Sequence, residues 1–124
     1  MKVLALDYGS ARTGVAVSDP TGIVARPVTT VERAATDAGF AKLLAVIAAE
    51  EPDLVVVGMP LTLRGEHGAQ ARETDAFVER LRDAVDPPVE TYDERFTSVL
   101  ADGDDARAAA HLLAGYLEWQ NASR

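Results

Sequence analysis

Apolar residues follow a period of two in the first quarter of this chain. From Met1 to Val31 the apolar runs are short, and glycine and proline turns separate them. This pattern predicts three strands, over residues 2–7, Thr13–Asp19 and Ile23–Val31. Connections this short favour an antiparallel meander.

After residue 31 the period changes to three and four residues, which is typical of helices with one buried face. The pattern predicts helices over Ala35–Glu50, Ala69–Val85 and Asp105–Gln120. Between them, β-branched runs predict strands over Leu54–Gly58 and Val89–Tyr92. Aromatic residues at helical spacing, Phe77, Tyr116 and Trp119, are expected to pack on the core.

The predicted order β-β-β-α-β-α-β-α indicates a single α/β domain over residues 1–124. Three antiparallel strands followed by βα units form a mixed five-stranded sheet with helices on both faces, which is the ribonuclease H-like topology. A doubly wound nucleotide-binding sheet would instead need a helix after the first strand. No helical pattern occurs there.

Composition limits the chemistry. The chain has no cysteine, which excludes disulfides and thiolate metal sites. It has no apolar run long enough to cross a bilayer, and the apolar part of its first residues is too short for a signal peptide, so we expect a cytoplasmic protein. The net charge of −8 argues against a broad nucleic-acid surface, although a local basic patch or bound metal ions could offset it.

Three carboxylates are candidates for one site. Asp7 ends the first predicted strand, Glu94 follows the last one, and Asp105 begins the last helix on its inward stripe. Sites in such sheets form outside the carboxyl ends of parallel strands, so these side chains are expected to converge. Oxygen-only ligands suit Mg²⁺ or Mn²⁺, and two such ions can promote phosphodiester hydrolysis.

Each carboxylate also has a simpler explanation. Asp7 could form an Asx-turn with the glycine turn that follows it, Glu94 could pair with Arg95, and Asp105 or its neighbour Asp104 could cap the helix. The metal interpretation therefore requires all three to converge. Four arginines near the same edge could bind phosphate groups or could serve only solubility: Arg12, Arg64, Arg72 and Arg95.

Taken together, the motifs resemble the YqgF family, also called RuvX. The matching stretches are "LALDYGSARTGVAVSD", "LVVVGMPLTLRGEHGAQARETDAFVERL" and "VETYDERFTSV", and "DARAAAHLLAGYLE" resembles the closing helix of the family. The resemblance implies a bacterial ribonuclease H-like nuclease that matures the 5′ end of 16S rRNA precursors with a divalent metal. Carried over by position, it implies Asp7, Glu94 and Asp105 as catalytic and metal-binding residues.

One segment departs from the family pattern. The stretch between Thr97 and Asp105 is shorter than in the family, where it is rich in Lys and Arg. If the register differs here, Asp102 or Asp104 would replace Asp105.

Three functions follow as candidates. The first is cleavage of structured RNA, most directly pre-16S rRNA, and the second is resolution of branched DNA by the same carboxylates. The third is a catalytically degenerate member that binds a ribosomal or transcription partner. A junction-resolving enzyme would need a dimer, because two strands are cut with two-fold symmetry; otherwise the sequence is compatible with a monomer or a weak homodimer.

Overall fold

The computed structural model describes residues 1–60, 64, 67–93 and 105–122, and its elements follow the predicted order. The strands among these residues are β1 (Val3–Asp7), β2 (Arg12–Ser18), β3 (Ala25–Glu32), β4 (Leu54–Met59) and β5 (Val89–Asp93). The helices are α1 (Asp37–Glu50), α2 (Ala69–Ala84) and α3 (Asp105–Ala122). No helix among the described residues is long and apolar enough to cross a membrane.

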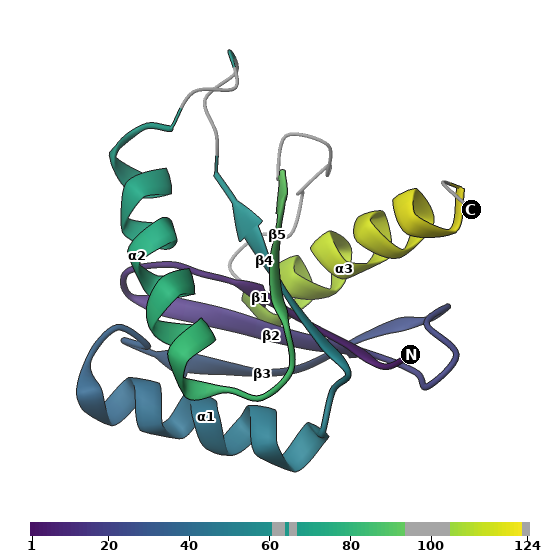
Figure 1. The fold of residues 1–124 in the computed structure, drawn as a ribbon, viewed down its shortest axis with the longest axis horizontal. Coiled ribbons are helices and arrows are strands. Elements are labelled where there is room, and N and C mark those ends of the chain that lie inside the picture. The colour runs from purple at the N-terminus through teal and green to yellow at the C-terminus, as the bar shows by residue number, and fades with distance from the viewer. Residues whose placement is uncertain (61–63, 65–66, 94–104, 123–124) are drawn as a thin grey trace.

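The strands form one mixed sheet in the order β3-β2-β1-β4-β5 (Figure 1). The β1–β2 and β2–β3 pairs are antiparallel, whereas β1–β4 and β4–β5 are parallel. This arrangement confirms the predicted ribonuclease H-like sheet. It also brings the carboxyl ends of β1, β4 and β5 to one edge.

Alternate residues of each strand face different helices. In β1, Leu4 and Leu6 belong to the core cluster that packs against α1 and α2, while Val3 and Ala5 belong to the cluster that packs against α3. The helices therefore cover both faces, with α3 on the face opposite α1 and α2 (Figure 1). By this alternation Asp7 lies on the α3 face of the sheet.

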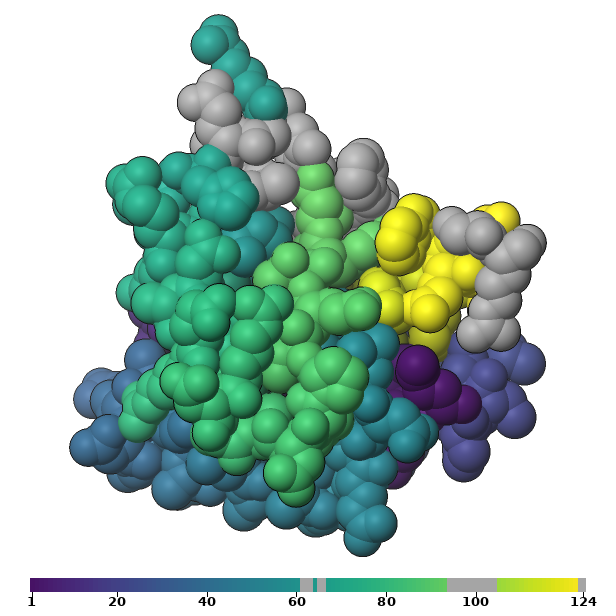
Figure 2. Space-filling view, in the orientation of Figure 1, coloured from purple at the N-terminus to yellow at the C-terminus, as the bar shows by residue number. Residues whose placement is uncertain are grey.

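One prediction about the core is wrong. Tyr116 is buried on the inward stripe of α3, but Trp119 is 56% exposed. The two residues are three positions apart, yet the buried stripe continues through Leu117 and leaves Trp119 at its border. Figure 2 shows the end of α3 and the strand β5 side by side on the viewed surface.

The third strand begins two residues later than predicted because of Asp19. Its carboxylate accepts hydrogen bonds from the backbone amides of Ile23 and Val24 at 2.8 and 2.7 Å, so these amides are not available to the sheet. Hydrogen bonds from the Thr21 side chain and from these amides hold the pKa of Asp19 well below its usual range. The result is a tight turn that leaves Ile23 and Val24 exposed.

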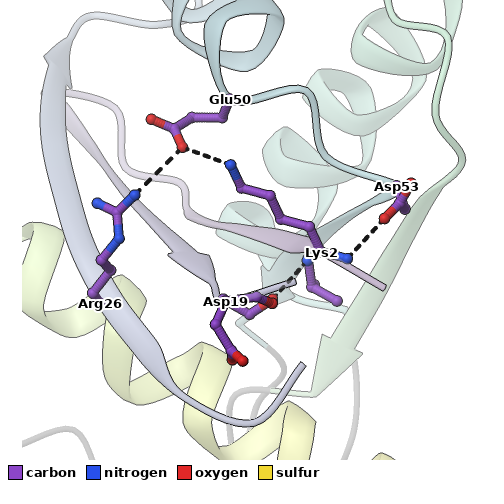
Figure 3. A network of polar contacts seen from close by, with 7 residues as sticks. Lys2, Asp19, Arg26, Glu50 and Asp53 are labelled. Atoms are coloured by element: carbon purple, nitrogen blue, oxygen red, sulfur yellow. Dashed lines mark hydrogen bonds and ion pairs between the residues drawn. The ribbon is translucent and has the colours of Figure 1, made fainter. Parts of the chain in front are cut away.

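Polar contacts connect residues beside the amino ends of β1 and β4 (Figure 3). The amide of Lys2 donates to Asp53 Oδ2 at 2.8 Å, and the Lys2 Nζ lies 3.1 Å from Glu50 Oε1. The Arg26 guanidinium reaches the same Glu50 oxygen at 3.7 Å. Cations and carboxylates thus pair at this end of the sheet, opposite the edge at which Asp7 lies.

The position of α3 depends on a very close approach to β2. A Cβ atom built on Gly14 would lie 1.7 Å from the carbonyl oxygen of Asp105, the first residue of α3. Only a glycine fits at this point, and the reason is space rather than backbone conformation, since Gly22 is the only described glycine with positive φ. The contact fixes where α3 begins.

We predict that Gly14→Ala destabilises the protein by about 1–3 kcal/mol, the usual cost of overpacking. In a strand with ordinary dihedrals, the same change would otherwise be neutral or stabilising. Urea denaturation monitored by circular dichroism measures the effect. The control is Ala114→Ser on the exposed side of α3, which should change stability by less than about 0.5 kcal/mol. Equal stability of Gly14→Ala and the parent would show that α3 is free to move off β2.

Candidate functional site

Asp7 and Asp105 come together at the carboxyl edge of the sheet. Asp7 is the residue directly opposite Gly14 in the antiparallel β1–β2 pair, and Gly14 contacts the backbone of Asp105. Opposed residues in such a pair have Cβ positions about 5 Å apart, so the Asp7 Cβ lies within roughly 7 Å of the Asp105 carbonyl oxygen. Two carboxylates that are 98 positions apart in the sequence therefore share one face and one edge.

Arg12 neutralises one of these carboxylates. Its Nε lies 2.9 Å from Asp105 Oδ2, and both side chains are partly exposed, at 58% for Arg12 and 31% for Asp105. Arg12 reaches this position because it opens β2, which runs antiparallel to β1 and starts beside the end of β1. A solvent-exposed ion pair of this kind contributes little to the stability of the fold. A metal cation can therefore replace the Arg12 guanidinium beside Asp105 at little cost in stability.

The turn that follows Asp7 is fixed to α2. The Tyr8 ring stacks on Phe77 with centroids 4.3 Å apart, and Ser10 Oγ donates to Glu73 Oε2 at 2.9 Å. Burial raises the pKa of Tyr8, and the nearby Glu73 charge and its hydrogen bond raise it further. This neutral, anchored phenol holds the backbone between Asp7 and Arg12 in place.

Sequence reasoning missed Tyr8 and Ser10 as positioning residues. The available signal was their place in the turn directly after Asp7. Their partners lie on α2, more than sixty positions away, and no local pattern identifies them.

The predicted arginines differ in their surroundings. Arg64 is exposed. Arg72 is on the first turn of α2, where its Nη1 donates to the His67 carbonyl at 3.3 Å, and so helps to hold the segment before the helix. Glu94 and Arg95 lie outside the described residues, as do the alternative ligands Asp102 and Asp104. Among the arginines that the structure describes, Arg12 pairs with a predicted site carboxylate, Asp105.

The donor set of Asp7 and Asp105 fits a hard divalent cation, because both supply carboxylate oxygens and both lie on one face. Within the described ranges no group of three or more His, Asp or Glu side chains forms a metal site. The predicted third ligand, Glu94, directly follows Asp93, the last residue of β5. The described part of the chain thus contains two of the three predicted ligands.

Comparisons with known proteins identify a matching family model and several similar proteins. A family model described as "RuvX: Holliday junction resolvase" matches residues 1–119. A protein of Chloroflexus aggregans named "Putative pre-16S rRNA nuclease" is 43% identical over 100 residues, which cover 81% of this chain and 70% of that protein. A protein of the same name from Anaeromyxobacter is 36% identical over 137 residues, covering 98% of this chain and all of that protein.

Among solved structures, Thermus thermophilus RuvC in complex with a Holliday junction substrate has the same fold. Its TM-score is 0.62 at 16% identity, with 99% of this chain and 97% of that chain covered. The sheet that places Asp7 and Asp105 together is thus the RuvC-like sheet. On the family match and these relatives, the chain belongs to the RuvX family.

Proposed function

We propose that this protein is a metal-dependent nuclease that hydrolyses phosphodiester bonds in structured RNA and processes the 5′ end of pre-16S rRNA. The observation that carries the proposal is the placement of Asp7 and Asp105 on one face at the carboxyl edge of the sheet. The name shared by its relatives supports rRNA precursor as the substrate.

Asp7, Asp105 and Glu94 would hold Mg²⁺ or Mn²⁺ in this proposal. Bound ions of this kind activate a water molecule and stabilise the leaving oxygen of a phosphodiester. The residues of the chain supply position and charge. Asp105 is fixed by the contact of α3 with Gly14, and Asp7 is fixed by β1 and by the anchored turn that follows it.

Arg12 is the proposed phosphate-binding residue. Its guanidinium is more than half exposed beside Asp105, and a planar fork of donors suits two phosphate oxygens. Metal bound at Asp105 would compete with Arg12 for the carboxylate, so that the released guanidinium could turn to the substrate. In a chain of net charge −8, such local cations are needed to bind a polyanion.

We predict that Asp7→Asn abolishes Mg²⁺- or Mn²⁺-dependent cleavage of a pre-16S rRNA fragment, because the amide cannot supply the ligand charge. The substitution is nearly isosteric, so the thermal melting temperature should change little. The assay compares parent, Asp7→Asn and Asp83→Asn, in which an exposed carboxylate of α2 is removed as the control. Equal cleavage by the parent and Asp7→Asn would contradict the proposed role of Asp7.

The same assay includes a four-way DNA junction as a second substrate, because the family description names a Holliday junction resolvase. Cleavage of the junction but not of the RNA would identify the DNA activity instead. Binding of the RNA fragment without cleavage at any metal concentration would indicate that the protein is a catalytically degenerate family member, which binds but does not cut.

We further predict that Arg12→Gln strengthens Mn²⁺ binding by roughly two- to five-fold, because the guanidinium no longer competes for Asp105. Isothermal titration calorimetry measures this affinity. Arg26→Gln is the matched control, since it removes a similarly exposed arginine paired with Glu50 at the opposite end of the sheet. Mn²⁺ affinity that is unchanged or lower in Arg12→Gln would contradict the competition.

A further inference from the structure

Three aromatic rings form a surface cluster between β5 and the end of α3. The centroid of Tyr92 lies 5.5 Å from that of Tyr116 and 6.0 Å from that of Trp119, and the two α3 rings are 5.9 Å apart. Tyr116 is buried, Tyr92 is half-buried and Trp119 is 56% exposed. A tryptophan held at this exposure by two other rings presents a rigid apolar surface to solvent.

The cluster lines a cavity of about 620 Å³, which also has Glu90, Asp93 and Arg82 in its wall. This volume lies in the range typical of small-ligand sites. The cavity lies where the green β5 and the yellow end of α3 meet in Figure 2.

The cavity is close to the proposed catalytic edge. Leu6 pairs with Val57 and Gly58 pairs with Tyr92, so Asp7 and Tyr92 lie in the same cross-strand row, with β4 between them. Both residues are on the α3 face, and two strand spacings separate them by about 10 Å. A nucleic-acid strand that passes Asp7 is therefore within reach of the aromatic cluster.

The polar groups of the cavity indicate which part of a nucleic acid it would accept. Glu90 and Asp93 repel a phosphate group but accept hydrogen bonds from an amino group. Glu90 already accepts one hydrogen bond within the protein, from the Tyr116 hydroxyl to Glu90 Oε2 at 3.1 Å. Burial and this contact with Glu90 raise the pKa of Tyr116 to about 12, so the phenol stays neutral at ordinary pH.

Aromatic side chains stack on bases of any sequence, whereas carboxylates favour bases that offer an exocyclic amino group. We propose that Tyr92, Trp119 and Glu90 form a subsite for an unpaired nucleobase that carries an amino group. The subsite would lie next to the phosphate group that is cleaved at the Asp7 site. Arg82, whose guanidinium donates to the Val89 carbonyl at 3.2 and 3.0 Å, is the cation among the residues that line this cavity. The inference rests on the proposed function, because it places the base relative to the cleaved strand.

Trp119 is the only tryptophan of the chain, so its fluorescence reports on this cavity alone. The experiment titrates the parent protein with hexacytidylate or hexauridylate in the presence of EDTA, which prevents cleavage. We expect hexacytidylate to quench the emission to saturation and to bind several-fold more tightly than hexauridylate. Glu90→Gln should remove most of that preference while leaving the quenching.

Two further variants test the stacking by anisotropy of labelled hexacytidylate. Tyr92→Leu and Trp119→Leu should each weaken binding by roughly 5- to 100-fold, the loss expected for one stacked base. Ile23→Ala is the matched control, because it removes an exposed apolar side chain from the turn at the opposite end of the sheet. Its affinity should equal that of the parent.

Parent-like affinity in Trp119→Leu, or hexacytidylate and hexauridylate that bind equally, would overturn the subsite. So would a shift of the Trp119 emission with protein concentration alone, which would mean that a second copy covers this face. If cleavage depends on Asp7 but the Trp119→Leu affinity is unchanged, the subsite fails and the nuclease proposal stands. If quenching occurs and no cleavage is found, the nuclease proposal fails and the base site stands.

Discussion

The contact between the Gly14 backbone and the first residue of α3 is the constraint on which the carboxyl edge of this sheet depends. The contact leaves no room for a side chain at position 14 of β2, and it brings Asp105 beside the end of β1. Without it, α3 could shift along the sheet face while still burying its apolar stripe, since apolar packing is not directional. The close approach therefore fixes a distance that hydrophobic burial alone would leave open.

The two ends of the sheet differ in how their charged side chains are paired. At the amino end, Lys2 and Arg26 share Glu50, and Asp53 accepts from the chain itself, so the charges stabilise the fold. At the carboxyl end, Arg12 pairs with Asp105, and that contact is open to solvent. Carboxylates that share one edge of a sheet repel one another, and a hard divalent cation would offset that repulsion, which is the physical reason to look for a metal there.

The strongly acidic balance of the chain has consequences for how it could bind a nucleic acid. A net charge of −8 argues against a broad basic surface, so affinity would depend on local cations and on contacts that do not involve charge. Stacking on Tyr92 and Trp119 is such a contact, because it involves the neutral face of a base. An acidic nuclease with an aromatic subsite would hold the base by its ring and the phosphate through Arg12 and bound metal.

The sequence by itself determined the elements and their order, because apolar periodicity and turn residues are local properties: the strand ending at Asp7 and the helix beginning at Asp105 are both where the pattern predicts them. It also excluded thiolate ligands, since the chain has no cysteine. Only the tertiary structure decided that Gly14 lies against Asp105, that Arg12 pairs with that carboxylate, and that Tyr8 and Ser10 anchor to α2. It likewise decided that Trp119 stays exposed, against expectation, although its helical spacing matches that of buried neighbours. These contacts join residues that are 63 to 93 positions apart, and they depend on which faces of the elements meet. The periodicity within one element does not identify the element that packs against it.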